Sequence, residues 1–200
     1  MQANKIIIVV CEGPSEESYL KELNRVLKEE NIPLVFCPKP SGSGHYSIIE
    51  KLYKKVRKNN PRSEEIEIWV DKDIYERNDS GNGDKYSSKP SNIPNFLFSY
   101  FNYEDALVLH LDYEQIKKWE QICQRKNHFN YPLNSCEYEV LFKNNVFNDY
   151  EKGTFPLNNF DIETIKNAIK NNNDETIKFK SDMLKLIEKE LNIYEHNVNH

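Results

Sequence analysis

The sequence predicts an α/β protein, with a parallel sheet flanked by helices and a helical extension at its C-terminal end. Three observations support this class. The continuous apolar run IIIVV at residues 6–10 is typical of a strand that is buried on both faces. Strand-like and helix-like segments then alternate as β-α-β-α-β up to residue 70, which is the order of parallel strands with covering helices. From residue 104 onward, most segments have helical spacing.

The first half of the chain supplies three strands and two helices. A buried strand is expected at 5–11, and Gly13 and Pro14 suit the N-cap and first position of an amphipathic helix over 14–30. A short strand follows at 34–37, bounded by prolines. A second helix is expected after the SGSGH turn, ending before 59. Alternating apolar residues at 66–70 predict the third strand, which ends in DKD.

The second half begins with a polar segment at 76–95, rich in Gly, Ser, Asn and Asp. Loops of that length are usually functional or disordered, so this one is a candidate for substrate contact or gating. A fourth strand is expected at 96–103. Helices are then expected at 104–126, 136–147, 161–171 and 174–194.

The composition is that of an ordinary soluble protein. Of the 200 residues, 38% are hydrophobic and 30% are charged, which suits one sizeable core. The apolar runs are too short to cross a bilayer, and no secretory signal pattern precedes residue 6, so a cytoplasmic protein is expected. The net charge of −5 argues against a broad basic surface for nucleic acid, although local patches can still attract phosphates.

Carboxylates follow two of the predicted strands. Glu12 comes directly after the first strand, and Asp71 and Asp73 come after the third. Because ligands collect beyond the carboxyl ends of parallel strands, the three should converge at one sheet edge. Clustered carboxylates repel one another unless a cation neutralises them, and oxygen-only ligands suit Mg²⁺ or Mn²⁺. Such an ion can activate water for attack at phosphorus.

Each acidic residue also has a structural explanation. Glu16 and Glu17 lie in the first helical turn, where carboxylates favour the helix dipole whatever the function. An aspartate after a strand is often only a turn residue. No turn or cap requires Glu12, which favours a site. A flavodoxin-like receiver would also gather acids at strand ends, but it needs a late Lys and a Thr or Ser switch that cannot be placed in this sequence.

Two basic segments and one Cys/His group complete the candidates. Residues 51–62 carry no acid, and their cations are expected to bind a nucleic-acid backbone or to be a solvated helix face: Lys51, Lys54, Lys55, Arg57 and Lys58. A shorter basic segment contains Lys117, Lys118, Arg125 and Lys126. Cys123, His128 and Cys136 could be considered as zinc ligands, but their spacing fits no familiar zinc module.

The motifs carry a family resemblance. EGPSE at 12–16 and DKD at 71–73, in a β-α-β-α-β order, resemble a TOPRIM domain, the metal-binding fold of topoisomerases, primases and OLD-family nucleases. SYFNYEDALVLHL at 99–111, then Tyr150, Lys152 and NAIKN at 167–171, resemble the RloB-like and AbiLii-like group, which is linked to restriction loci and abortive infection. Against that group's pattern, Tyr100 and Phe101 replace an Asn-Pro pair, Ala106 replaces a Trp, and Tyr103 replaces a Phe.

The resemblance implies a TOPRIM core over residues 1–112 and a helical extension over 113–200. It implies a Mg²⁺- or Mn²⁺-dependent nuclease in anti-phage defence, with RNA such as tRNA favoured over DNA. Glu12, Asp71 and Asp73 would be the main ligands, and Glu16 would support a second ion or act as a base. Glu104 would add a carboxylate.

Lys152 would stabilise the pentavalent phosphate or the leaving oxygen. The alternatives are a surface lysine for Lys152 and a helix cap for Glu104. His110 has either a direct role or the role of a hydrogen-bonded core histidine. A competing hypothesis is a non-catalytic regulatory or adaptor subunit of a defence complex. Nucleic acid, a partner protein or a second copy of the chain are the partners considered, and no membrane is expected.

Overall fold

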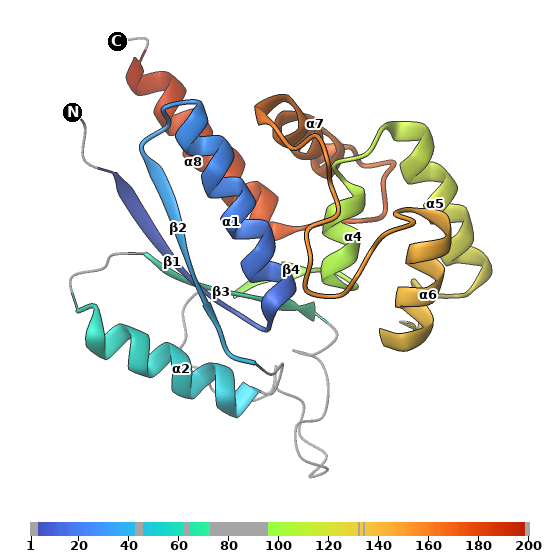
Figure 1. The fold of residues 1–200 in the computed structure, drawn as a ribbon, viewed down its shortest axis with the longest axis horizontal. Helices are drawn as coiled ribbons and strands as arrows, with labels where there is room; N and C mark the ends of the chain where they lie inside the picture. Colours follow the sequence, from blue (N-terminus) through green and yellow to red (C-terminus); the bar gives the residue numbers. More distant parts are fainter. Residues whose placement is uncertain are drawn as a thin grey trace.

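The fold is built on one four-stranded parallel sheet. The computed structural model describes residues 4–42, 46–61, 65–72, 96–131, 133 and 135–198. The strands are β1 (Lys5–Cys11), β2 (Leu34–Pro40), β3 (Ile66–Asp71) and β4 (Phe96–Ser99), in the order β2-β1-β3-β4 (Figure 1). All three pairings are parallel, which confirms the predicted α/β sheet flanked by helices.

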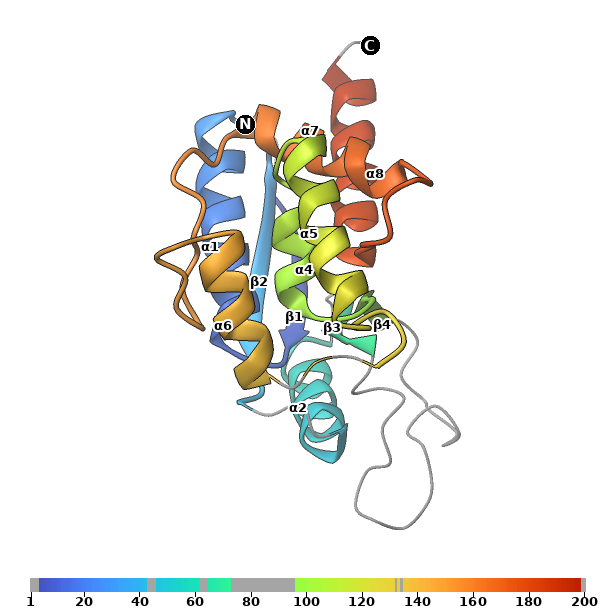
Figure 2. The same cartoon turned by 90° about the vertical axis from the view of Figure 1, so that its right-hand side faces the viewer.

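Two apolar clusters, one on each face of the sheet, hold the helices. In β1, Ile7 and Val9 join a cluster with the helix α1 (Pro14–Glu29), whereas Ile8 and Val10 join a cluster with α2 (Tyr46–Asn59). The run IIIVV is therefore continuous because alternate residues are buried on opposite faces. Figures 1 and 2 show α2 on one side of the sheet and α1 on the other.

The later helices extend the α1 side. They are α4 (Tyr103–Val108), α5 (Tyr113–Arg125), α6 (Ser135–Asn145), α7 (Ile162–Asn173) and α8 (Asp182–Val198). Buried residues of all five belong to the same apolar cluster as Ile7 and Val9 of β1. In Figure 1, α5 and α6 lie beyond the sheet on the side of α4. None of the described helices has both the length and the apolar character needed to cross a membrane.

Several predicted boundaries were wrong. The second strand runs to Pro40 rather than ending at 37. The fourth strand ends at Ser99 rather than 103, because Ser99 forms an antiparallel bridge with Ser181 and the chain then turns into α4. The helical segment expected at 104–126 consists of two helices, since Asp112 caps a new helix and accepts a hydrogen bond from the Gln115 N–H. The last helix begins at Asp182 rather than at 174, because the preceding residues pass along β4. The predicted loop at 76–95 lies outside the described residues.

Candidate metal and phosphate site

A cavity lies at the carboxyl edge of the sheet, where β1 and β3 end and α1 begins (Figure 1). Its volume is ≈ 250 Å³. We call it the carboxylate cavity; its lining consists of Glu12, Gly13, Pro14, Ser15, Glu16, Gly42, Asp71, Tyr103, Glu104 and Lys152. Glu12, Glu16, Asp71, Glu104 and Lys152, all predicted from the sequence as site residues, therefore share one space. Asp73, also predicted, lies outside the described residues.

Glu12 connects two strand ends. Its carboxylate Oε1 accepts a hydrogen bond from the backbone N–H of Asp71 at 2.8 Å. Its own carbonyl oxygen accepts from the Ser41 hydroxyl at 3.1 Å, beyond the end of β2. The side chain thus reaches from β1 toward β3, which is the convergence expected at the edge of a parallel sheet.

Glu16 lies deepest among the carboxylates. It is at the third position of α1, and its Oε2 accepts from the Gly13 N–H at 3.1 Å in a capping box. Its exposed fraction is 5%. Burial raises the pKa of Glu16 to about 8, and the negative charge of Glu12 adds to this increase. Glu16 therefore both caps the start of α1 and lines the cavity.

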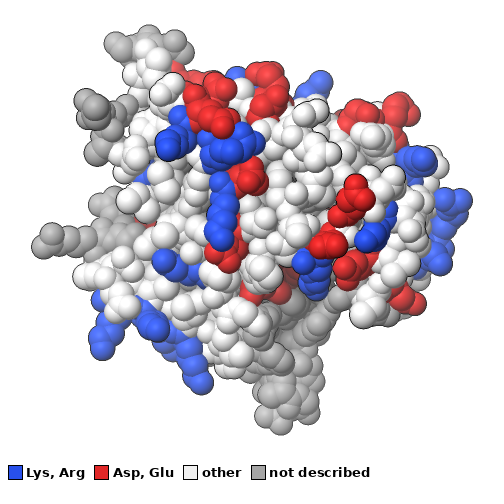
Figure 3. Space-filling view, viewed as in Figure 1, with Lys and Arg blue, Asp and Glu red and all other residues white. Residues whose placement is uncertain are grey.

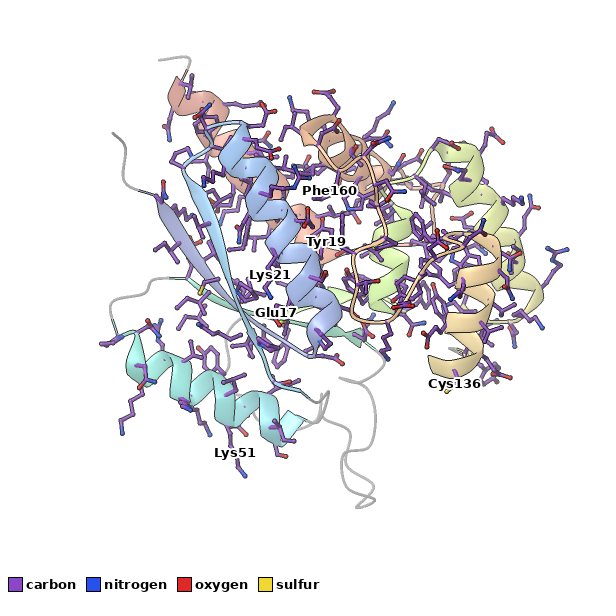
Figure 4. The ribbon with its side chains drawn as sticks, in the orientation of Figure 1. Glu17, Tyr19, Lys21, Lys51, Cys136 and Phe160 are labelled. Atoms are coloured by element: carbon purple, nitrogen blue, oxygen red, sulfur yellow. The ribbon has the colours of Figure 1, made fainter. Side chains whose placement is uncertain are left out.

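Its neighbour Glu17 behaves differently. The Glu17 carboxylate forms an ion pair with Lys21 at 2.8 Å, one turn along α1, and it does not line the cavity (Figure 4). An i,i+4 pair on an exposed helix face accounts for this glutamate. Of the two glutamates in the first turn, only Glu16 faces the site.

Glu104 is held in place from the C-terminal part of the chain. Glu104 is the second residue of α4, and its Oε1 accepts a hydrogen bond from the Tyr150 hydroxyl at 2.7 Å. Tyr150 is buried, and burial and the Glu104 charge both raise the pKa of its phenol, which keeps the donor protonated. The sequence contained Tyr150 as part of a motif, but it did not indicate that this residue orients a carboxylate.

Lys152 supplies a positive charge at the exposed side of the cavity. The segment between α6 and α7 returns to the start of α1, where the Gly153 N–H donates to the Ser15 hydroxyl at 3.1 Å (Figure 1). Gly153 has φ +90°, a conformation that favours glycine. A Cβ at this position would lie 3.3 Å from Pro14 Cγ. The fold thus brings Lys152 into the cavity lining beside the start of α1.

The donor set suits a hard divalent cation. All candidate ligands are carboxylates, and Mg²⁺ and Mn²⁺ prefer such oxygen ligands. Within the described ranges, no three His, Cys, Asp or Glu side chains are already grouped closely enough to hold one metal ion. Binding by Glu12, Glu16, Asp71 and Glu104 therefore requires their side chains to turn toward one another.

Comparison with known protein families gives a match over most of the chain. A model of the RloB-like protein family matches residues 7–191. The chain belongs to the RloB-like family. The matched range contains every residue of the carboxylate cavity. No curated protein matches the chain, and no solved structure does.

His110 of this RloB-like protein lies in the core and not in the cavity wall. Its Nε2 lies 3.1 Å from the Tyr19 hydroxyl, and its ring packs against Phe160. Burial lowers the pKa of His110 to about 4, so the imidazole is neutral at physiological pH. Of the two interpretations of this histidine, the structure supports the hydrogen-bonded core residue.

The predicted nucleic-acid residues lie on α2, on the opposite face of the sheet from α1. All five side chains are exposed: Lys51, Lys54, Lys55, Arg57 and Lys58. Figure 3 shows blue side chains gathered over this helix at the lower left, and Figure 4 shows Lys51 pointing away from the sheet. Lys54 also pairs with Glu50 at 2.6 Å. These cations form a surface that is separate from the cavity lining.

The Cys/His group does not form a zinc site in the part of the chain that the structure describes. His128 is fully buried, and its Nδ1 accepts a hydrogen bond from the Leu133 N–H at 3.1 Å. Cys123 is buried, whereas Cys136 is exposed on α6. The ring of His128 packs against Phe101 and Tyr138, so its role is structural.

Proposed function

We propose that this RloB-like protein is a metal-dependent endonuclease that hydrolyses phosphodiester bonds at the carboxylate cavity. One observation carries the proposal: Glu12, Glu16, Asp71 and Glu104 line the same cavity as Lys152. Carboxylates held close together repel one another, and the raised pKa of the buried Glu16 reflects burial and that repulsion. A divalent cation would relieve the repulsion, which gives the site a reason to bind one.

The carboxylates and the lysine would have different roles in the reaction. Glu12 and Asp71, together with Asp73, would be the main ligands of Mg²⁺ or Mn²⁺, supported by Glu16 and Glu104. When bound, the ion supplies charge neutralisation and lowers the pKa of water. Lys152 would bind a phosphate oxygen at the exposed side of the cavity and stabilise the negative charge that develops there.

The remaining contacts would control the proton of Glu16 and the orientation of the Glu104 and Glu12 side chains. In the metal-free protein, Glu16 retains its proton near neutral pH, because its pKa is about 8, and would release it as the cation binds. The Tyr150 hydroxyl holds Glu104 toward the cavity through its 2.7 Å hydrogen bond. The Asp71 N–H holds Glu12 in the same way at 2.8 Å.

The exposed cations of α2 would hold the sugar-phosphate backbone of the substrate. RNA such as tRNA is the favoured substrate over DNA, and the biological setting would be bacterial anti-phage defence. Both statements rest on the resemblance of the motifs to the RloB-like and AbiLii-like group. The negative net charge is compatible with this, since the cations are gathered locally on one helix.

The test is cleavage by the purified protein of labelled tRNA, single-stranded DNA and duplex DNA, with Mg²⁺, with Mn²⁺ and with a chelator. Cleavage should require the metal and should be lost in Glu12→Ala and Asp71→Ala. Glu17→Ala is the matched control, because Glu17 lies beside Glu16 but pairs with Lys21 outside the cavity. Metal-dependent cleavage that survives both cavity substitutions would refute the assignment.

A second function, that of a non-catalytic regulatory or adaptor subunit, is favoured by one observation. Among the described residues, no three potential ligands stand ready to hold a metal ion. In this case the protein would bind nucleic acid or a nucleotide without cutting it. Nucleic-acid binding that is insensitive to Mg²⁺, with no cleavage of any of the three substrates, would select this alternative.

A further inference from the structure

The Tyr103 side chain forms part of the deepest wall of the carboxylate cavity. Its exposed fraction is 3%, and it is the first residue of α4. The ring is fixed by edge-to-face contacts with Trp69, at 5.6 Å between centroids, and with Tyr19, at 6.5 Å. Because aromatic neighbours hold the ring, the position of its hydroxyl is set by packing.

The Tyr103 hydroxyl is buried and has no hydrogen-bond partner among the described residues. The other two tyrosines in contact with this region are satisfied: the Tyr19 hydroxyl bonds with His110, and the Tyr150 hydroxyl donates to Glu104. An unsatisfied buried hydroxyl destabilises the fold, because it has lost its hydrogen bonds to water without replacement. A ligand inside the cavity would remove that destabilisation.

The charges around the hydroxyl indicate which ligand it meets. Glu16 and Glu104 line the same cavity as Tyr103, and a phenol is protonated at neutral pH, so its hydroxyl is available as a donor. A ligand between the Tyr103 hydroxyl and the Glu104 carboxylate, which already accepts from Tyr150, must accept one hydrogen bond and donate another. A water molecule does both, whereas a phosphate oxygen can only accept and would be repelled by the carboxylates.

We propose that the Tyr103 hydroxyl donates a hydrogen bond to a water molecule at the floor of the carboxylate cavity and positions that water for hydrolysis. The second half of this proposal rests on the proposed nuclease function; the first half does not. The depth of the site supports water over a polymer group, since Tyr103 and Glu16 are 3% and 5% exposed whereas Lys152 lies at the exposed side. Tyr103 is thus a positioning residue.

The water itself is tested by crystal structures of the metal-free protein and of Tyr103→Phe. The substitution removes only the hydroxyl and keeps the ring that packs against Trp69 and Tyr19, so the variant should keep the fold. We expect an ordered water about 2.7 Å from the Tyr103 hydroxyl and within hydrogen-bond reach of Glu16 or Glu104. The water should be missing in the variant, with the ring unmoved. A hydroxyl that donates to a protein atom, or a floor without water, would overturn the proposal.

The positioning role is tested by kinetics on the metal-loaded protein. Tyr103→Phe should lower kcat about 10- to 100-fold, with KM for the nucleic acid changed by less than about 2-fold. Tyr19→Phe is the control, because it also removes a buried hydroxyl from this aromatic cluster but lies outside the cavity lining. It should leave kcat within about 2-fold of the parent.

The two experiments separate the two claims. A water that is present while kcat is unchanged in Tyr103→Phe would overturn the positioning role alone. If the parent protein cleaves no nucleic acid, the proposed function fails, and the crystal structures still decide whether Tyr103 binds water.

Discussion

The Glu12 carboxylate accepts a hydrogen bond from the backbone N–H of Asp71 at 2.8 Å, and this bond ties the end of β1 to the end of β3. The bond holds the carboxylate of Glu12, one candidate ligand, against the backbone of Asp71, a second candidate ligand. The geometry also allows the charge of Glu12 to be removed without removing the hydrogen bond, since a glutamine side-chain oxygen can accept from the same N–H.

Glu12→Gln should therefore reduce cleavage without disturbing the fold. We expect cleavage to fall at least about 100-fold, because an amide is a much weaker metal ligand than a carboxylate. The thermal midpoint should change little. Cleavage rates in Mg²⁺ and a thermal melt of the same preparations check this, with Glu17→Gln as the control. A large loss of stability in Glu12→Gln would show that the charge serves the fold.

Glu16→Gln should stabilise the metal-free protein at alkaline pH. The folded pKa of about 8 lies above the ordinary 4.5, so between these values the folded state binds more protons than the unfolded state. Stability is therefore lost as the pH rises through this range, by about 5 kcal/mol at most. Glutamine carries no charge and can still accept from the Gly13 N–H. Urea denaturation with a chelator should show a higher free energy of unfolding for the variant than for the parent at pH 9, and no such increase at pH 5.

His110 should make stability depend on pH in the acidic range. Its folded pKa of about 4 lies below the ordinary 6.5, so the unfolded state binds more protons between these values. Stability from the neutral imidazole is full above pH 6.5 and falls by about 3 kcal/mol as the pH drops to 4.

His110→Gln should lose this component of the pH dependence. The measurement is the free energy of unfolding at several values from pH 4 to pH 7, compared with the parent. Parallel curves for the two proteins would contradict the burial of a neutral histidine.

Gly153→Ala should disturb both stability and cleavage. At φ +90°, a Cβ would be strained and would lie 3.3 Å from Pro14 Cγ, so the segment carrying Lys152 must shift. We expect a loss of about 1–2 kcal/mol and a fall in kcat that approaches that of Lys152→Ala. Gly42→Ala is the comparison for stability, because Gly42 has φ +74° but no atom of the described residues lies within 4 Å of its Cβ position. Equal losses of stability in the two variants would exclude a role for the Pro14 contact.

Removing cations from α2 should weaken nucleic-acid binding in a salt-dependent way. A triple change of Lys51, Lys55 and Lys58 to Ala should reduce the slope of log affinity against log salt by about 0.7–0.9 for each phosphate that the protein no longer neutralises. The control changes Lys118, Arg125 and Lys126, which are also exposed, on or next to α5. Titration of labelled tRNA at several salt concentrations provides both slopes. A larger reduction of the slope in the control variant would contradict the assignment of the binding surface to α2.

Local sequence patterns predicted the elements whose bounds depend on residues that are close together along the chain. β1 has the predicted bounds, and α1 differs from its prediction by one residue, since their apolar spacing and the Gly13-Pro14 start are local signals. The end of β4 was predicted wrongly because Ser99 pairs with Ser181, a contact between distant segments that no local pattern contains.

The site residues divide in the same way, into those that local patterns predict and those whose positions depend on distant segments. Glu12 and Asp71 could be placed together from the rule that parallel strands end at one edge. Glu104 and Lys152 came only from the family resemblance, since their positions depend on Tyr150 and on the Gly153–Ser15 contact. The hydroxyl of Tyr103 gave no signal, because a buried aromatic residue before a helix is expected in any core.

The hydrogen bond between Ser15 and Gly153 joins residues 138 positions apart. A nascent chain that has only its first strand and helix outside the ribosome therefore has Glu12 and Glu16 but no Lys152 beside them. The site becomes complete only after the segment that follows α6 has been made. Translation order alone thus delays the assembly of this cavity until Lys152 and Gly153 can reach the start of α1.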